Sequence, residues 1–253
     1  MRKLLTSLGA VVMALALSAA ELPAATKHII IVDPGHGGSA DSGSQGKRSL
    51  SASNNAASPG GLEEKDLTLQ LSLEIQRQVA LLAKDHPAVE IECVLTRKSD
   101  TNPDFIERAA ACAAVKPLPT AIFSVHFNAS DSHTAIGTET MVHNKGVNQN
   151  FAADTEFASG LSKAAHAAVA KFVEGTKLRG NIADSHLHNG AGSNYFYQLT
   201  QLKTLAAVPK CFLEVEFIDR ADVEKQLLNP REKTFPVIAH AIANYLYAYC
   251  ESK

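Results

Sequence analysis

Two histidines and a glutamate in this sequence are the residue types that hold a catalytic zinc ion. His36 follows the β-branched run at residues 29–32 after a turn of Asp, Pro and Gly, and His126 directly follows the apolar run at residues 121–125. Glu64 lies where an amphipathic helix is expected to begin. Two imidazoles and a carboxylate leave the fourth tetrahedral position for water, so this set would activate water for hydrolysis. The simpler alternatives are a solvated turn histidine and a first-turn acid favoured by the helix dipole.

Strand-like and helix-like segments alternate along the chain, which predicts a single α/β domain with a twisted, mostly parallel sheet and helices on both faces. Helices are expected at residues 67–82, 103–113, 157–172 and about 234–249, the last with Pro236 in its first turn. Strands are expected at residues 29–32, 90–96, 121–125 and 211–217, an exposed strand at 137–143, and loops at 39–61 and 175–194. In such sheets, ligands bind beyond the carboxyl ends of the strands, where both histidines are expected.

Residues 1–25 have the organisation of a secretory signal peptide. Arg2 and Lys3 precede an apolar run at residues 4–17, and small residues follow, so cleavage is expected after about Ala20 or Ala25. An uncleaved anchor is the alternative, although the run is too short to span a bilayer. Export would place residues 26–253, a single catalytic domain, in the periplasm or otherwise outside the cytoplasm, without stable membrane insertion.

The net charge and the cysteines of the chain bear on its possible partners and on its possible disulfide bonds. The formal net charge of −2 gives no electrostatic reason to expect nucleic acid as a partner. The four cysteines, Cys93, Cys112, Cys211 and Cys250, allow three disulfide pairings in an oxidising compartment, and the sequence does not choose among them. Cys93 and Cys211 lie in apolar runs, where they are equally well interpreted as buried thiols.

Six short motifs, spread in order over nearly the whole mature chain, resemble those of one enzyme family. They are IVDPGHGG (31–38), GLEEKD (61–66), LTR (95–97), SVHFNA (124–129), GTET (137–140) and LEV-x-FI (213–218). In these motifs the chain resembles the zinc-dependent N-acetylmuramoyl-L-alanine amidases of the bacterial cell wall, which include the periplasmic cell-separation amidases.

The resemblance implies one zinc ion bound by His36, Glu64 and His126. It selects Glu64 over Glu63 because the family's ligand glutamate directly precedes a Lys-Asp pair. Glu214 falls on the family's catalytic glutamate, which would take a proton from water and return it to the leaving amine. The implied substrate and partner is peptidoglycan, cut at the amide between N-acetylmuramic acid and the L-alanine of the stem peptide, in cell-wall remodelling or cell division.

The chain departs from the family pattern near its third apolar strand. Glu216 stands where the family usually has glycine, and Asp219 and Arg220 stand where it has Ser-Asn. In a regular strand Glu214 and Glu216 share one face, so the two acids would repel and raise a pKa, or Glu216 would share catalysis or bind substrate. The interval after His126 is also too short for the inserted helix that blocks the site in many cell-separation amidases. We therefore expect an open site for which an activator protein is possible but not required.

Two functions of other classes stay open at this stage. Ser44 and Lys47 fit an S-x-x-K signature and residues 53–55 fit S-x-N, two of the three signatures of penicillin-binding serine enzymes. The third, Lys-Thr-Gly, is absent from the sequence, so a serine D-alanyl carboxypeptidase activity is the weaker alternative. The other is an inactive peptidoglycan-binding domain on the same scaffold.

The remaining candidate residues are expected to have structural roles. Arg108 resembles a recurrent arginine of the family and is expected to pack its helix. Five further histidines match no family ligand and are expected to be structural or solvated: His133, His143, His166, His186 and His188.

Overall fold

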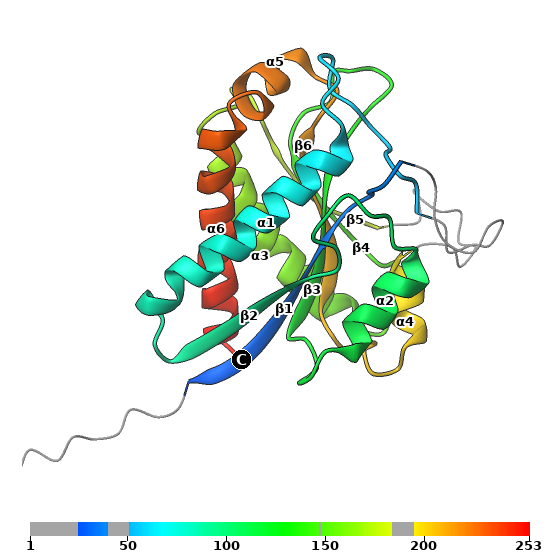
Figure 1. Ribbon diagram of the computed structural model, residues 1–253, viewed down its shortest axis with the longest axis vertical. Helices are drawn as coiled ribbons and strands as arrows, with labels where there is room; N and C mark the ends of the chain where they lie inside the picture. The colour runs from blue at the N-terminus through cyan, green and yellow to red at the C-terminus, as the bar shows by residue number, and fades with distance from the viewer. Residues whose placement is uncertain (1–24, 40–50, 147, 184–194) are drawn as a thin grey trace, which may run out of the picture.

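The centre of the protein is a sheet of six strands: β1 (Thr26–Pro34), β2 (Val89–Leu95), β3 (Ala121–Asn128), β4 (Thr138–Val142), β5 (Leu178–Ala183) and β6 (Lys210–Phe217). The computed structural model describes residues 25–39, 51–146, 148–183 and 195–253. The strand order is β2-β1-β3-β6-β4-β5, and only the β4–β6 pairing is antiparallel (Figure 1). The predicted class, an α/β domain with a mostly parallel sheet, is confirmed.

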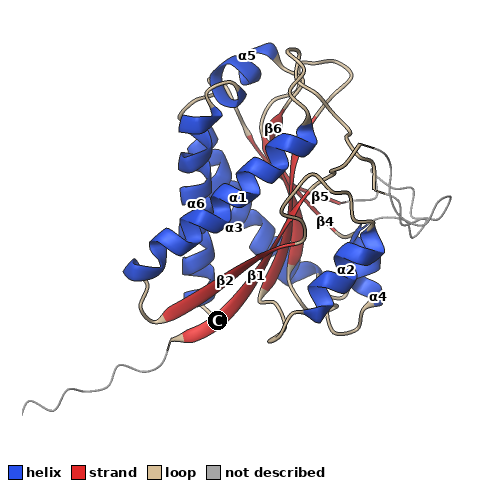
Figure 2. Cartoon of the chain, in the orientation of Figure 1, coloured by secondary structure: helices blue, strands red, loops and turns tan. Residues whose placement is uncertain are grey.

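Helices cover both faces of this sheet, as predicted (Figure 2). One layer contains α1 (Glu64–Leu82), α3 (Phe151–Val169) and α6 (Arg231–Glu251), and the other contains α2 (Phe105–Ala114) and α4 (Tyr195–Gln201). A 3-10 turn (Ala83–Asp85) follows α1, and α5 (Ala221–Val223) and a π-helical turn (Glu224–Leu228) precede α6.

The apolar run of β1 contributes side chains to the cores beneath both helical layers. Ile30 and Val32 belong to the core beneath α1, α3 and α6, whereas Ile29 and Ile31 belong to the core beneath α2 and α4. Successive side chains of a strand point to opposite faces, so a strand covered on both sides needs a continuous apolar run. Because a strand covered on both faces needs such a run, β1 and β3 can be predicted from the sequence alone.

Two predictions in the second half of the chain are wrong. The strand at 137–143 was expected to be exposed, but every residue of β4 is buried, because β4 lies between β6 and β5 and packs against α3. The predicted loop at 175–194 contains β5, whose sequence Leu-Arg-Gly-Asn-Ile-Ala has no apolar alternation. As the last strand in the sheet order, β5 forms through its pairing with β4 rather than through its own propensity.

The ends of the helical layer also differ from prediction. α6 begins at Arg231, so Pro236 lies inside the helix rather than in its first turn. A proline there leaves the carbonyl of Glu232, four residues earlier, without its helical donor. Glu232 is exposed, so water can satisfy that carbonyl. Helix α4 was not predicted at all.

Several predictions fall on residues that the structure does not describe. These are the signal peptide up to residue 24, the serine–lysine pair Ser44 and Lys47, and the histidines His186 and His188. The segment between β3 and β4, residues 129–137, is described and contains no helix, in agreement with the short interval noted above. Within the described ranges, no helix combines the length and hydropathy that crossing a membrane requires.

All four cysteines are free and buried. The interpretation of Cys93 and Cys211 as buried thiols is therefore confirmed, and Cys112 and Cys250 join them. Burial raises the pKa of the Cys93 thiol to about 12, which keeps it protonated and unreactive at neutral pH.

Leu71 and Leu73 provide a matched test of the core beneath α1. Leu71 is fully buried, whereas Leu73, on the same helix, is 38% exposed. Leu71→Ala is expected to lower the free energy of unfolding by about 2–5 kcal/mol, because it removes buried methyl groups and leaves a cavity. Leu73→Ala should cost about 0.5 kcal/mol. Urea unfolding followed by circular dichroism measures both, and equal losses would contradict this packing.

Candidate metal centre

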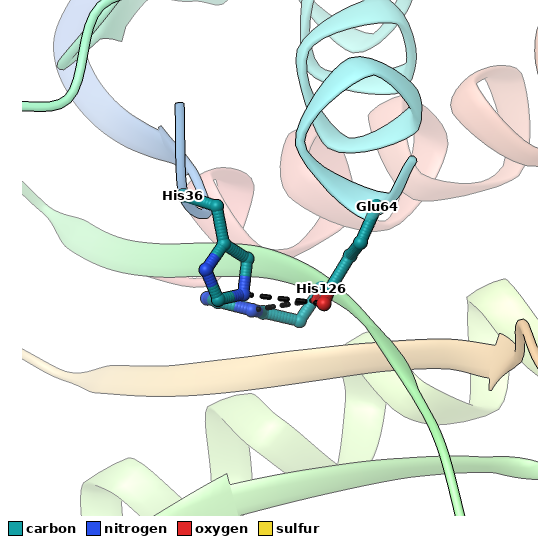
Figure 3. A group of neighbouring side chains, drawn as sticks. All are labelled: His36, Glu64 and His126. Atoms are coloured by element: carbon teal, nitrogen blue, oxygen red, sulfur yellow. Dashed lines mark hydrogen bonds and ion pairs between the residues drawn. The ribbon is translucent and has the colours of Figure 1, made fainter. Parts of the chain in front are cut away.

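His36, Glu64 and His126 meet at the carboxyl edge of the sheet (Figure 3). The two histidines come from the ends of β1 and β3, and Glu64 is the first residue of α1. His36 Nε2 lies 3.2 Å from Glu64 Oε2, and His126 Nδ1 lies 3.1 Å from Glu64 Oε1. One ligand atom from each residue lies within 4.8 Å of the others, and this is the one such cluster in the described part of the chain. The fold thus brings the three predicted ligands together.

The hydrogen bonds of His36 leave one of its nitrogens available. Its Nδ1 lies 3.0 Å from the carbonyl oxygen of Ala52, an acceptor, so the ring proton is placed on Nδ1. Nε2 then presents a lone pair to the Glu64 carboxylate. Two acceptors at this distance require a cation or a proton between them. Burial opposes protonation of His36, but the charge of Glu64 and the hydrogen bonds to Glu64 and Ala52 together outweigh burial and raise the pKa of this imidazole.

Glu64 supplies the negative charge of the cluster. It is only 2% exposed, and although burial alone would raise its pKa, His36 and His126 hold that pKa at about 2. The backbone N–H of Phe127 donates to Oε1 over 3.1 Å, whereas Oε2 has no hydrogen-bond partner. Neighbouring Glu63 has a side chain that is 47% exposed and faces Lys65. Of the two adjacent acids, Glu64 is therefore the one that points into the cluster.

The spacing of the cluster fits a tetrahedral ion. Ligand bonds of about 2.0–2.1 Å at tetrahedral angles put neighbouring ligand atoms about 3.3 Å apart. The separations of 3.2 Å from His36 to Oε2 of Glu64 and of 3.1 Å from His126 to Oε1 are close to this spacing, and the three ligand atoms all lie within 4.8 Å of one another. Two imidazoles and one buried carboxylate, one of whose oxygens has no hydrogen-bond partner, therefore form a donor set that suits a borderline divalent cation such as zinc.

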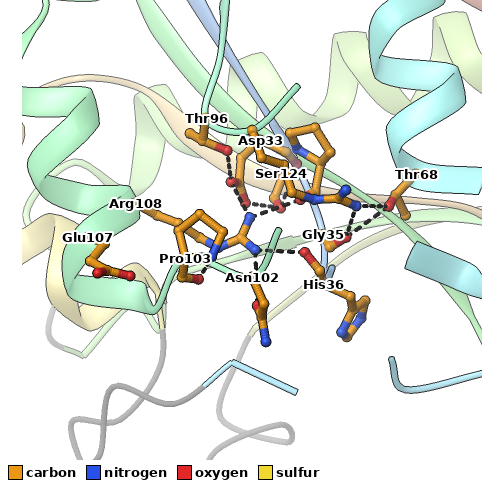
Figure 4. A network of polar contacts seen from close by, with 12 residues as sticks. Asp33, Gly35, His36, Thr68, Thr96, Asn102, Pro103, Glu107, Arg108 and Ser124 are labelled. Atoms are coloured by element: carbon orange, nitrogen blue, oxygen red, sulfur yellow. Dashed lines mark hydrogen bonds and ion pairs between the residues drawn. The ribbon is translucent and has the colours of Figure 1, made fainter. Parts of the chain in front are cut away.

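Two buried arginines, Arg97 and Arg108, fix the turn that carries His36. Figure 4 shows Arg108 among its partners. Arg108 donates to Asp33 Oδ1 over 2.7 Å and to the carbonyls of Pro34 and His36 over 2.8 Å each. Arg97 donates to the carbonyls of Pro34 and Gly35 over 3.0 and 2.8 Å. The two guanidinium groups thus bind the carbonyls of three successive residues, Pro34, Gly35 and His36. These hydrogen bonds hold His36 in the left-handed conformation (φ 59°). Arg108 therefore does more than pack its helix, and the sequence analysis gave Arg97 no role although it belongs to the LTR motif.

The helix that carries Arg108 begins with a capping box. The Asp104 side chain accepts a hydrogen bond from the Glu107 backbone over 2.8 Å, and the Glu107 side chain accepts one from the Asp104 backbone over 2.7 Å. Arg108 follows one residue later and also donates to the carbonyl of Pro103. The cap therefore fixes both the start of α2 and the direction in which the guanidinium leaves it.

Glu214 lies beside the cluster on the neighbouring strand. It is the register partner of His126 on β3 and of Glu139 on β4. Its Oε2 is buried without a hydrogen-bond partner, and burial, Glu64 and Glu139 together raise its pKa well above the ordinary value. A carboxylate with this environment is suited to exchanging protons with a reacting group. Glu139, within the GTET motif, was not singled out by the sequence analysis.

The expectation that Glu214 and Glu216 share one face is wrong. His126 pairs with Glu214 but Asn128 pairs with Phe217, so two residues of β6 stand opposite Phe127. Such a β-bulge turns the strand by one residue, and Phe217 takes the face that Glu216 would have had. Glu216 instead accepts hydrogen bonds from the backbone of Gly137 and the hydroxyl of Thr176, both over 2.5 Å. Its carboxylate stabilises a loop rather than the reacting edge.

The other two departures from the family pattern hold that same loop, residues 129–137. Asp219 Oδ2 lies 2.8 Å from His133 Nδ1 and accepts from the backbone of Ser130 over 3.2 Å. Arg220 donates to the carbonyl of Thr134 over 2.9 Å. His133 is thus a loop residue, and neither it nor His143 nor His166 belongs to the metal-binding cluster.

The described chain gives little support to a serine mechanism. Asn54, from the S-x-N pattern, donates to the carbonyl of Ala56 and accepts from the backbone of Lys65, so it stabilises the loop before α1. Ser44 and Lys47 lie outside the described residues, and the serine alternative stays a prediction.

The model of one protein family, described as N-acetylmuramoyl-L-alanine amidase, matches residues 30–246. The chain belongs to this family. It is therefore a hydrolase of the N-acetylmuramoyl-L-alanine amidase type, and the resemblance seen in the six motifs is confirmed. A comparison with curated proteins finds no match.

Solved structures of amidases have the same fold. The catalytic domain of CwlV from Bacillus (Paenibacillus) polymyxa var. colistinus is 23% identical with a TM-score of 0.63, over 89% of this chain and 99% of that one. Ami1 from Mycobacterium smegmatis is 19% identical with a TM-score of 0.65, over 89% and 98%. CwlD from Clostridioides difficile, solved with the GerS lipoprotein, is 18% identical with a TM-score of 0.58, over 89% and 100%.

Gly35 lets the ring of His126 lie against the end of β1. A Cβ at this position would fall within 3.0 Å of Cε1, Nε2 and Nδ1 of His126, closer than side-chain atoms approach. Gly35→Ala is therefore expected to displace the imidazole and weaken metal binding by about tenfold or more, in the range seen when ligand orientation is disturbed. Competition with a chromophoric chelator measures the affinity. Gly146→Ala, where the nearest atom lies 3.7 Å away, is the matched control, and equal affinities in both variants would contradict this role.

Proposed function

We propose that this protein is a zinc-dependent amidase that hydrolyses the bond between N-acetylmuramic acid and the L-alanine of the peptidoglycan stem peptide. His36, Glu64 and His126 bind one zinc ion, and Glu214 is the catalytic glutamate. The observation that carries this proposal is the buried Glu64 carboxylate between two imidazoles, with Glu214 on the adjacent strand. Family membership supplies the reaction class.

The chain's own residues divide the chemistry between them. Zinc in such a site lowers the pKa of water and polarises a carbonyl. Glu214 accepts the proton of the attacking water and delivers it to the leaving amine of L-alanine, so that the proton balance closes within one site. Arg97 and Arg108 keep His36 in place, and Gly35 leaves room for His126.

The cellular setting follows from the amino-terminal pattern. We propose that residues 1–25 are an export signal, that residues 26–253 are the catalytic domain, and that the enzyme acts on the cell wall from the periplasm in cell-wall remodelling or cell division. The basic pair, apolar run and small residues at 1–25 support this proposal.

Activation by a partner protein is possible but not required in this proposal. One structural neighbour, CwlD, was solved in complex with the GerS lipoprotein. In this chain the β3–β4 segment is a short loop held by Glu216, Asp219 and Arg220, with no helix at 129–137 to cover the site. We therefore propose an open site that is active without a partner.

Metal removal tests the cofactor. Dialysis against a chelator is expected to abolish release of stem peptides from purified peptidoglycan, and stoichiometric zinc is expected to restore it, because zinc supplies the activation of water and the polarisation of the carbonyl. Mass analysis of the products identifies the bond that is cut. Full activity in verified metal-free protein would contradict the proposal, and cleavage between stem residues would contradict the assigned bond.

Two variants separate metal binding from catalysis. His126→Ala is expected to lose both bound zinc and activity, because it removes a ligand. Glu214→Ala is expected to retain zinc while activity falls by about a hundredfold or more, the usual contribution of a general base. Metal analysis and product release are measured on the same preparations. Glu216→Gln is the control, and an active Glu214→Ala beside an inactive Glu216→Gln would reverse the assignment within β6.

A further inference from the structure

We propose that Arg179 forms a subsite for a carboxylate of the stem peptide, beside the amide that is hydrolysed. This inference rests on the proposed function and adds the charge of the substrate that the site prefers. Arg179 lies on β5, the strand that the sequence analysis did not predict, and no motif includes it.

Several contacts hold the Arg179 side chain in one position. Its Nε donates to Glu139 Oε2 over 2.5 Å, and its guanidinium lies 5.1 Å from the centre of the Phe217 ring. Its aliphatic carbons pass over Gly137, where a Cβ would fall within about 3.0 Å of them. Glu139 in turn accepts from Asn128 over 2.6 Å. The orientation of the guanidinium is thus fixed before any ligand arrives, which reduces the entropic cost of binding.

The guanidinium lies on the same face of the sheet as the catalytic glutamate. Phe217 pairs with Asn128, and Asn128 shares a face with His126 because the two are two residues apart on β3. The arginine that covers Phe217 therefore lies on the face of His126 and Glu214. The β-bulge that removes Glu216 from this face puts Phe217 in its place, and so creates the surface on which Arg179 rests.

Arg179 also keeps donors free for a ligand. The side chain is 39% exposed even though its partner Glu139 is only 6% exposed. Within the described residues its terminal nitrogens donate to no acceptor, and Nε alone is engaged. A guanidinium with two free nitrogens is a fork that matches a carboxylate in two parallel hydrogen bonds.

The distance suits a short peptide. Glu214, Glu139 and Gly180 are register partners across β6, β4 and β5. Strands lie about 4.8 Å apart, so Arg179 is on the order of 10 Å from Glu214. An extended peptide spans about 3.3–3.6 Å per residue, so a carboxylate about three residues from the scissile bond reaches it.

The local charges explain why such a subsite is needed. A peptide carboxylate that approaches this edge comes near the buried acids Glu139 and Glu214, so a positive charge beside them favours its approach. Arg179 supplies the opposite charge at the rim. The alternative role, neutralisation of Glu139 alone, would stabilise the fold but would not distinguish one substrate from another.

A matched pair of substrates tests the subsite. One is a muramoyl tripeptide with a free carboxyl terminus, and the other is the same molecule with an amidated terminus. Zinc-loaded wild-type protein is expected to show a KM about tenfold or more lower for the acidic substrate at similar kcat, because a charge-assisted bidentate contact is lost on amidation. Arg179→Gln is expected to raise KM for the acidic substrate alone, and Arg179→Lys is expected to recover only part of the preference.

The control is Lys177→Gln, which removes the same charge from an exposed side chain two residues earlier and should leave the preference unchanged. Equal KM values for the two substrates in wild type would overturn the proposal, whether or not the Arg179 variants fold. A uniform loss of kcat in Arg179→Gln, with its preference intact, would assign Arg179 to structure instead.

A binding measurement separates this proposal from the amidase assignment. Calorimetric titration of Glu214→Gln with both peptides is expected to show tighter binding of the acidic one. If binding of the acidic peptide depends on Arg179 but the wild-type protein hydrolyses neither peptide, the proposed reaction is contradicted and the subsite is supported. If the wild-type protein hydrolyses both peptides without preference, the proposed reaction is supported and the subsite is contradicted.

Discussion

A buried carboxylate that cannot be neutral organises this end of the molecule. Glu64 has almost no contact with solvent, and one of its oxygens has no hydrogen-bond partner. An isolated charge in such a place is costly, so the protein must supply a positive charge beside it. His36, whose pKa is raised beside Glu64, does so in its protonated form, whereas burial lowers the pKa of His126. Together the two rings lower the pKa of Glu64, which keeps its carboxyl group ionised. A proton on one imidazole or a divalent ion among the three residues satisfies the same requirement, so binding of a metal would release a proton.

The remainder of the carboxyl edge keeps these three residues within reach of one another. β1 and β3 are paired as far as Pro34 and Val125, but His36 lies beyond the paired segment and Glu64 belongs to a helix. Arg97 and Arg108 hold the carbonyls between the end of β1 and His36, where strand pairing has ended. Buried arginines are tolerated here because Asp33 is ionised as well: burial would raise its pKa, but Arg108 and the neighbouring hydroxyls lower it. A second set of buried charges, those of Asp33, Arg97 and Arg108, therefore supports the edge of the sheet that carries the metal-binding residues.

The sequence predicts what depends on local pattern and fails where the outcome depends on pairing. β1 and β3 are continuous apolar runs, and each delivers a histidine at its end. Glu64 could be chosen over Glu63 only through the family resemblance. The structure agrees with that choice, because Glu64 is buried in the cluster whereas the side chain of Glu63 is exposed. β5 has no periodicity of its own and forms against β4. The bulge in β6 is a matter of register between strands, so no pattern within residues 210–217 reveals that Glu216 leaves the reacting face. Arg179 was missed for the same reason, because its contacts come from three other segments.

The central claim is that one divalent ion sits among three side chains that are distant in sequence. Anomalous X-ray diffraction on crystals of the zinc-loaded protein, with data collected on both sides of the zinc absorption edge, tests it most directly. The account predicts one anomalous peak about 2.0–2.2 Å from an imidazole nitrogen of His36, a carboxylate oxygen of Glu64 and an imidazole nitrogen of His126. A fully occupied peak elsewhere, with this cluster empty, would contradict it.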